Sequence, residues 1–293
     1  VKLYNASGVF FHLEELHSVI DGIKFSLKED GVLIVQFMYA GTMIEKLNFD
    51  TIYHEHLCYY TLRSLNNLLA PYELKIFDAY YSEIHSGSIV AKIAHIGSWL
   101  DVETERYREL LEKDKGYSID AFKNFAQTIE SQKGNLRDTL QELKDDGKTI
   151  YAYGAPAKGN TLLNYFGIDK RLVDKAVEIN ELKVGNYLPQ SHIPITLEDK
   201  SDLPDYYLLL SHNFADEIIK KNQDIIAQGV KFIIPFPQVE IVGGWMYRQL
   251  IKENTGVEEN EFVPGYSHND GLRFDKDDEV HKMMDSMSEI VFK

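Results

Sequence analysis

The segment Tyr53-His54-Glu55-His56 is the densest group of residues in this sequence that could carry chemistry. Histidine titrates near neutral pH, so a histidine beside a carboxylate or a phenol can act as a general base. In an extended backbone, the two histidines would share one face, and the tyrosine and glutamate would share the other. The segment therefore predicts an acid–base site, although a polar surface loop fits the spacing equally well.

The His-x-His spacing of His54 and His56 also suits a metal site. No third ligand follows at a recognisable spacing, and the single cysteine, Cys58, cannot build a site based on several thiolates. We therefore expect no metal here and keep a metal enzyme as a minor alternative.

His12 stands where the first expected strand passes into its helix. Ligands of open α/β sheets bind outside the carboxyl ends of the strands, so this position favours a site residue. A packing or capping role for the ring is the alternative.

The segment Tyr153-Gly-Ala-Pro-Ala-Lys-Gly-Asn-Thr161 follows a strand-like run and opens a helix. Small residues at such a turn let backbone N–H groups approach a phosphate, and the helix dipole favours negative charge. Gly154, Lys158 and Asn160 are therefore candidate substrate contacts. The spacing is not that of a Walker loop, and a tight turn that needs glycine for its geometry is the alternative.

Glu178, Lys183 and Asn213 lie in segments that follow two later strand-like runs. An acid at a strand end of a nucleotide-binding fold commonly binds a ribose hydroxyl, which makes Glu178 a candidate substrate contact. Asn213 occupies the same kind of position after another strand. Solvated loop residues are the alternative for these positions.

Hydrophobic periodicity predicts the elements that must position these residues. In the first third of the chain, a strand, a helix and a strand form one βαβ unit, and a helix and a closing hairpin follow. The expected strands are 1–6, 32–37, 74–80 and 88–95, and the expected helices are 12–27 and 61–69.

The composition changes from 101 to 146, where Glu, Lys, Arg, Leu and Gln dominate and no Pro occurs. Long amphipathic helices that join two domains are expected there. A second α/β layer follows, with strands at 149–153, 176–179, 206–210 and 232–236 and helices at 157–165 and 215–227. We divide the chain into domains at 1–98 and 148–242, a connector at 99–147 and an unassigned acidic tail at 243–293.

The formal net charge of the 293 residues is -15. Duplex binding depends on Lys and Arg that neutralise phosphates, so this balance argues against a nucleic-acid partner. No run of about 18 apolar residues is present, so we expect no membrane span. One cysteine cannot form an internal disulfide, and we expect a reducing, cytoplasmic compartment.

Several separate segments resemble, in the same order, the C-methyltransferases that act on nucleotide-linked 4-keto-deoxysugars. The segments are 48–57, 64–65, 85–88, 153–167, 183–185, 193–195, 213–217 and 234–237. The resemblance covers about Val1 to Val242. It implies a Rossmann-like methyltransferase core and a second α/β domain, which together embrace the nucleotide sugar.

The resemblance implies that His56 removes the proton from sugar C3, next to the C4 ketone. Glu55, Tyr53 and His12 match residues that would orient this base or stabilise the enolate, which attacks the methyl group of S-adenosylmethionine. The remaining expected contacts are Ala6 and Ser7 to the cofactor, and His85, Ser88, Gly154, Lys158, Asn160, Glu178, Lys183 and Asn213 to the substrate.

The sequence departs from the family pattern in its first part. No cysteine cluster and no Gly-rich strand-to-helix turn precede Val1, and Ala6-Ser7-Gly8 stands where the family tends to have Ala-Asn-Asn. We therefore expect the zinc-binding module and the first part of the S-adenosylmethionine site to be absent from this chain. The start of the chain should then be frayed, with apolar sheet surface exposed.

We expect an α/β fold: a partial Rossmann-like methyltransferase sheet, a helical connector and a second Rossmann-like domain. The expected function is methyl transfer to C3 of a nucleotide-linked 4-keto-deoxysugar, with this chain an incomplete form of the enzyme. A non-catalytic module that binds nucleotide sugars is the alternative.

Overall fold

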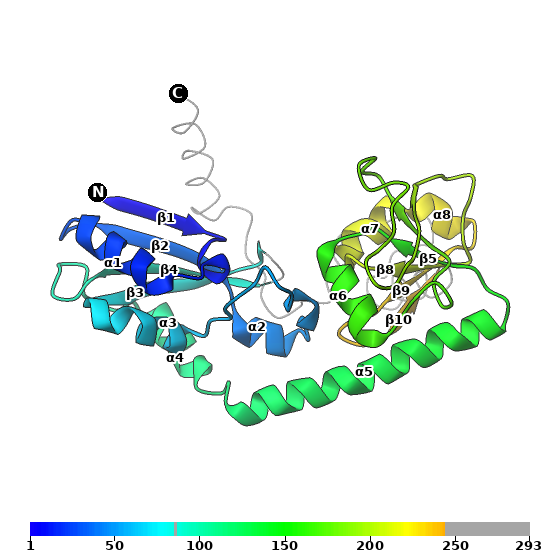
Figure 1. The fold of residues 1–293 in the computed structure, drawn as a ribbon. Coiled ribbons are helices and arrows are strands. Elements are labelled where there is room, and N and C mark those ends of the chain that lie inside the picture. The colour runs from blue at the N-terminus through cyan, green and yellow to red at the C-terminus, as the bar shows by residue number, and fades with distance from the viewer. Residues whose placement is uncertain (85–86, 244–293) are drawn as a thin grey trace, which may run out of the picture.

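The structure is a computed structural model, and it describes residues 1–84 and 87–243. Figure 1 shows two α/β domains side by side, with one long helix running along both of them. His85 and the expected tail from residue 244 onward lie outside the described residues.

The first domain contains, in chain order, β1 (Leu3–Ser7), the 3-10 helix η1 (Phe10–His12), α1 (Leu16–Ser26), β2 (Val32–Met38), α2 (Ala40–Glu45), η2 (Phe49–Thr51), α3 (Leu62–Leu69), η3 (Ala70–Tyr72), β3 (Leu74–Ser82) and β4 (Ser88–His95). Its sheet has the strand order β1-β2-β4-β3. β1 is parallel to β2, and β4 is antiparallel to both β2 and β3. The βαβ unit and the hairpin expected from the periodicity are both confirmed.

The second domain contains β5 (Ile150–Tyr153), α6 (Ala157–Phe166), β6 (Lys175–Glu178), β7 (Ile195–Leu197), β8 (Tyr206–Leu209), η5 (His212–Phe214), α7 (Ala215–Lys221), α8 (Gln223–Ala227), β9 (Lys231–Ile234) and β10 (Glu240–Val242). The strand order is β10-β9-β8-β5-β6-β7, and every pair except β10–β9 is parallel. The chain leaves β5 toward β6 on one side and reaches β8 on the other. This reversal of direction is the switch point of a doubly wound sheet, so the expected Rossmann-like fold is confirmed.

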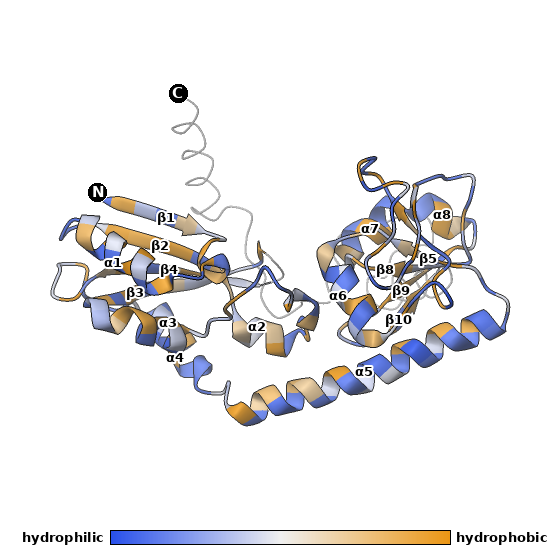
Figure 2. Cartoon of the chain, in the orientation of Figure 1, coloured by the Kyte–Doolittle hydropathy of each residue, from blue (hydrophilic) through white to orange (hydrophobic). Residues whose placement is uncertain are grey.

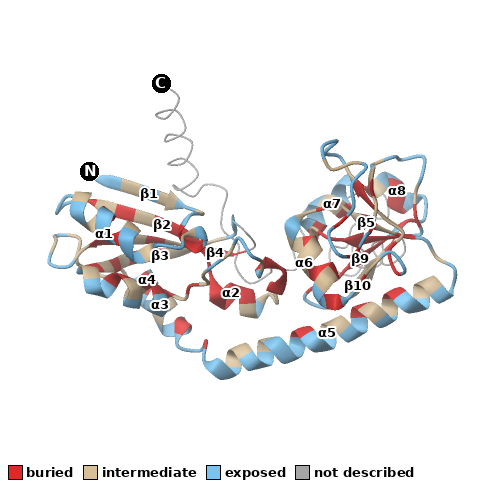
Figure 3. Cartoon of the chain, viewed as in Figure 1, coloured by how far each residue is buried: buried red, intermediate tan, exposed pale blue. Residues whose placement is uncertain are grey.

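Two helices connect the domains. α4 (Glu105–Asp114) packs on β3, and its Tyr107 is buried in the first core. α5 (Ile119–Asp145) is 27 residues long, and its Leu136 and Leu140 are buried in the second core. Figures 2 and 3 show the apolar, buried residues gathered in the sheets and on one side of α5, with an exposed hydrophilic outer side. The expected amphipathic connector is thus a single long helix preceded by a short helix that belongs to the first core.

Local interactions fix the ends of these helices. Thr61 and Ser64 form a capping box at the start of α3, where the buried carboxylate of Asp114 also accepts hydrogen bonds from the first backbone N–H groups. At the other end of the connector, Arg137 donates to the carbonyl oxygens of Phe166 and Gly167, which end α6. These contacts bind α4 and α5 to the domains that they join.

The structure differs from the expected elements in a few short places. The helix expected at 215–227 is divided into α7 and α8 by Asn222, whose buried amide donates to the carbonyl oxygen of Ile218 at 2.7 Å and to the hydroxyl of Tyr153 at 3.1 Å. α2, β7 and β10 were not expected at all, because each is three to six residues long and shows no periodicity of its own.

Candidate active site

The four candidate catalytic residues lie close together, but not on an extended strand. The N–H of His56 donates to the carbonyl oxygen of Tyr53 at 2.9 Å and closes a turn. The rings of Tyr53 and His56 are therefore 4.1 Å apart between centroids, and those of His12 and His56 are 5.1 Å apart. The alternation of faces that an extended backbone would give does not apply, because the segment forms a turn that brings residues 53 and 56 onto one side.

Each of the two clustered histidines is oriented by a backbone carbonyl. Nδ1 of His56 lies 2.7 Å from the oxygen of Thr51, and Nδ1 of His12 lies 2.6 Å from the oxygen of Glu55. A carbonyl oxygen only accepts, so the neutral form of each ring carries its hydrogen on Nδ1. Nε2 of each ring then holds the free lone pair that a base requires.

The surroundings of His56 favour the neutral ring. Burial lowers its pKa, and electrostatic interactions with His12 and Lys158 lower it further. The hydrogen bond to Thr51 and the carboxylate of Glu55 oppose these effects, but the net pKa is below the ordinary value. Burial and the nearby carboxylate of Glu55 raise the pKa of Tyr53. At neutral pH the site therefore offers an unprotonated imidazole beside a phenol that keeps its hydrogen.

The cluster lies at the carboxyl end of the parallel pair β1 and β2. β1 ends at Ser7, Gly8 adopts a left-handed φ of 67°, and η1 then delivers His12. The N–H of Leu57 donates to the carbonyl oxygen of Phe11 at 2.7 Å and ties the turn that carries His56 to η1. This is the edge of an α/β sheet where ligands bind.

Ala6 and Ser7, the expected cofactor contacts, lie at the same edge. Ala6 packs against the first core, and the exposed Ser7 hydroxyl donates to Oδ1 of Asn5 at 2.8 Å. Small residues at a parallel strand end beside His12 fit one border of a site for S-adenosylmethionine. Their contact with that molecule stays a prediction.

Glu178 and Lys183 are used within the protein to hold a loop. The Glu178 carboxylate accepts from the N–H groups of Ala155, Ile179 and Asn180 at 3.0–3.2 Å. Nζ of Lys183 donates to Glu178 at 3.1 Å and to the carbonyl oxygen of Ala155 at 3.0 Å. Burial opposes ionisation, but these donors outweigh it and lower the pKa of Glu178. The pair thus fixes the turn between β5 and α6, and direct substrate contact by either residue stays a prediction.

The other expected substrate residues are spread over several places. Gly154 has a φ of 83° in the turn after β5, and Oδ1 of Asn160 is buried with no hydrogen-bond partner in the described part of the chain. Burial lowers the pKa of Lys158, and the charge of Asp50 opposes this.

Ser88 is fully buried, accepts from Gln36 at 2.7 Å and donates to the carbonyl oxygen of Ile84 at 2.6 Å. The Ser88 hydroxyl is therefore occupied inside the first sheet.

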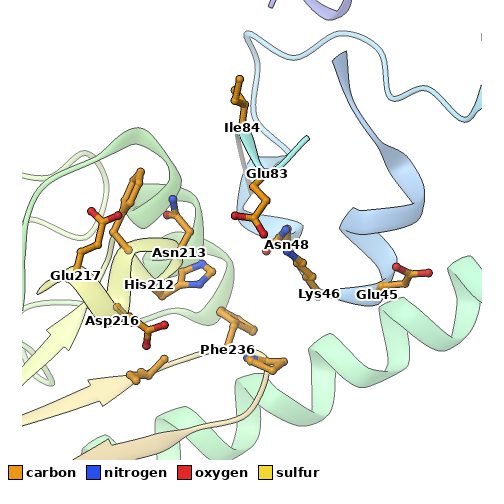
Figure 4. Close-up of a pocket in the computed structure, with 14 residues that line it drawn as sticks. Glu45, Lys46, Asn48, Glu83, Ile84, His212, Asn213, Asp216, Glu217 and Phe236 are labelled. Carbon is orange, nitrogen blue, oxygen red and sulfur yellow. The ribbon is translucent and has the colours of Figure 1, made fainter. Parts of the chain in front are cut away.

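A cavity of about 700 Å³ lies between the two domains. Figure 4 shows Glu45, Lys46, Asn48 and Glu83 on the side of the first domain and His212, Asn213, Asp216 and Glu217 on the side of the second. Of the expected substrate residues, Asn213 lines this cavity. Four carboxylates in the lining make it unfavourable for a diphosphate held by side chains alone.

Sequence reasoning missed the pair formed by Asp50 and His212. Nε2 of His212 lies 2.9 Å from Oδ2 of Asp50, and the two residues are 162 positions apart in the chain. Only their positions gave a signal: Asp50 stands inside the segment that resembles the methyltransferases, and His212 follows a strand end.

In the described part of the chain, no third side chain joins His54 and His56 to form a metal site. In residues 1–84 and 87–243, no three His, Cys, Asp or Glu side chains gather as a metal site would require. Among these same residues, no helix is both long and apolar enough to cross a bilayer.

The structure combines an α/β fold with a group of histidine and tyrosine rings at a strand end, and comparison with known proteins gives the family of the chain. Residues 83–237 match the model of the C-methyltransferase C-terminal domain. The chain is also 32% identical over 238 residues to the C-methyltransferase NovU of Streptomyces niveus, an alignment that covers 80% of this chain and 56% of that protein. The chain belongs to the C-methyltransferase family, and it spans little more than half the length of this relative.

Proposed function

We propose that this chain supplies the base and the second domain of an S-adenosylmethionine-dependent methyltransferase that acts at C3 of a nucleotide-linked 4-keto-deoxysugar. The observation that carries the proposal is the orientation of His56, whose Nδ1–H is held by a backbone carbonyl while Nε2 keeps its lone pair. The resemblance of residues 48–57 to sugar C-methyltransferases supports the choice of substrate.

Proton removal is the step that this site can perform. A C4 ketone acidifies the hydrogen on C3, so an imidazole with a lowered pKa can take that proton to Nε2 at neutral pH. The electron pair of the C3–H bond moves into the enolate. S-adenosylmethionine, when bound, supplies the methyl group that the C3 carbon of the enolate attacks.

Two other groups can offset the charge that develops on the C4 oxygen. The phenol of Tyr53 keeps its hydrogen because its pKa is raised, and its ring lies 4.1 Å from that of His56 between centroids. The positive charge of Lys158 acts on His56 from the second domain. Donors already in place where charge appears lower the barrier without reorganisation.

Deuterium uptake at sugar C3 tests the proposal without a methyl donor. The chain is incubated in D2O with thymidine diphosphate-linked 4-keto-6-deoxyglucose, and proton NMR follows the C3 and C5 signals. Both positions are next to the ketone, so faster exchange at C3 alone identifies a positioned base. His56→Gln should lower the C3 rate about 10²–10⁴-fold while binding of the nucleotide sugar persists.

The exposed neighbour gives the matched control. His54→Gln should leave the C3 rate unchanged, because His54 is exposed at the tip of the turn. A full C3 rate in His56→Gln would contradict the assignment of the base. Binding of the nucleotide sugar with no exchange in the unsubstituted chain would instead identify a binding module, and absence of both would contradict the proposal for this chain.

A further inference from the structure

A short segment of the first domain is built into the core of the second. Phe49, in η2, stacks on Phe166 with ring centroids 5.1 Å apart and an angle of 8°, and it meets the ring of Phe236 edge-on at 5.2 Å. Its side chain belongs to the buried cluster of the second domain. The second domain therefore holds η2 directly. The turn that carries His56 follows η2 in the chain, so its position depends on this contact.

Asp50 and His212 form a second connection at the same place. Their side chains are only 2% and 6% exposed, and Nε2–H of His212 donates to Oδ2 of Asp50 at 2.9 Å. Oδ1 of Asp50 is buried and has no hydrogen-bond partner within the described residues. Burial opposes ionisation of Asp50, but His212 and Lys158 outweigh it and lower its pKa. A buried, ionised carboxylate with a single hydrogen-bond donor is strongly destabilised if that donor is lost. The hydrogen bond from His212 therefore fixes the position of Asp50.

The next residue, Thr51, connects this pair to the base. Its carbonyl oxygen accepts from Nδ1 of His56 at 2.7 Å and from the hydroxyl of Tyr59 at 3.1 Å. Burial raises the pKa of Tyr59 to about 12, which keeps that hydroxyl a donor. The Thr51 hydroxyl donates to the carbonyl oxygen of Asn48 at 2.7 Å, so both the backbone and the side chain of Thr51 are fixed.

We propose that His212 is a positioning residue for the base: by holding Asp50, it fixes the Thr51 carbonyl that keeps His56 in the Nδ1–H form. The inference rests on the proposed role of His56. Without that carbonyl, the hydrogen can move to Nε2 and occupy the lone pair that must receive the C3 proton. The second domain thus contributes to the chemistry through one buried hydrogen bond, in addition to any contact with substrate.

The test combines two substitutions with a spectroscopic measurement on the whole chain. His212→Leu removes the donor, and Asp50→Asn removes the charge from a residue that does not line the cavity. Nitrogen-15 NMR of the imidazoles, assigned by the loss of one ring in His56→Gln, reports which nitrogen of His56 carries hydrogen. We expect the Nδ1–H form in the unsubstituted chain and a mixture of both forms in each variant.

Exchange at sugar C3 should follow the change in tautomer. With the same thymidine diphosphate-linked keto sugar, both variants should lose about 10- to 100-fold in the maximal rate, as misplacement of a reacting group does. The KM of Asp50→Asn should change much less than its maximal rate. His212→Gln, whose amide N–H can still donate to Asp50, should recover most of the rate and of the Nδ1–H form.

Neighbouring residues provide the controls. Asn213→Ala changes the cavity lining beside His212. Among the described residues no hydrogen bond joins Asn213 to Asp50, so the His56 tautomer should not change. A folded His212→Leu chain, judged by circular dichroism, with His56 wholly in the Nδ1–H form would overturn the inference. If His212→Leu does not fold, Asp50→Asn and His212→Gln decide it by the same readout. A changed tautomer without any change in exchange would contradict the role of His56 as base and leave the coupling intact.

Discussion

The loops at the carboxyl ends of the two sheets occupy equivalent places but are used differently. In the first domain, Nδ1 of His12 and Nδ1 of His56 each form a hydrogen bond with a backbone carbonyl oxygen, which leaves Nε2 of each ring available to a ligand. In the second domain, Glu178 and Lys183 satisfy one another and the surrounding N–H and carbonyl groups. Equivalent positions in a fold thus do not predict equivalent chemistry, because the local hydrogen bonds decide which polar atoms remain free.

The comparison also explains how the domains divide their work. His56, the proposed base, belongs to the first domain, while the second domain supplies the aromatic pocket for Phe49 and the donor for Asp50. Hydrogen bonds within the second domain hold its loops in place, which matters because a shift of this domain would also shift the turn that carries His56.

The largest effect is expected where the first domain enters the second. Phe49→Ala should reduce the free energy of unfolding by about 3–5 kcal/mol, because a buried aromatic side chain leaves a cavity among Phe166, Tyr165 and Phe236. Urea denaturation followed by circular dichroism measures the change. Phe25→Ala, at a position that is 92% exposed, should stay within about 0.5 kcal/mol of the unsubstituted chain. Equal losses in both variants would remove the distinction between anchor and surface.

A smaller effect is expected in the loop network of the second domain. Glu178→Gln weakens the hydrogen bonds to three backbone N–H groups and the ion pair with Lys183, which should cost about 1–3 kcal/mol of stability. Amide hydrogen exchange at Ala155 and Asn180 should rise in the same variant. The exposed Glu181→Gln in the same loop is the control and should change neither quantity. Unchanged exchange at Ala155 in Glu178→Gln would show that the network does not hold this turn.

The smallest effect is a displacement along the pH axis. Because the pKa of His56 is lowered, its neutral form persists below pH about 6.5, and the acid limb of C3 exchange should have its midpoint below that value. In the same interval the unfolded chain binds more protons than the folded chain, so stability should rise with pH there. His12→Asn removes a charge that lowers the pKa of His56 and should move the midpoint upward. A downward displacement would contradict this electrostatic assignment.

Much of the fold follows from the sequence, because strands and helices with several residues carry their own periodicity. The strand at 88–95 and the helix that begins at residue 157 agree with the expected limits. The position of β4 between β2 and β3 could not be deduced, since pairing order depends on the packed layers. The proximity of His12 to His56 is predicted only from the resemblance to a family, not from spacing or periodicity. Neither spacing nor composition predicts a contact such as Asp50 with His212, because it forms only when the two domains have folded together.

The length of α5 has a consequence for how this chain can evolve. Tyr117, just before the helix, is fixed in the first domain by its hydroxyl contact with Glu45, while Leu136 and Arg137 fix the helix to the second. Each inserted residue would turn one domain by about 100° and displace it by about 1.5 Å relative to the other. No insertion or deletion restores both the rotation and the distance. The outer face of α5 can therefore vary in sequence, whereas the number of residues between Tyr117 and Leu136 determines whether Asp50 of the first domain can still meet His212 of the second.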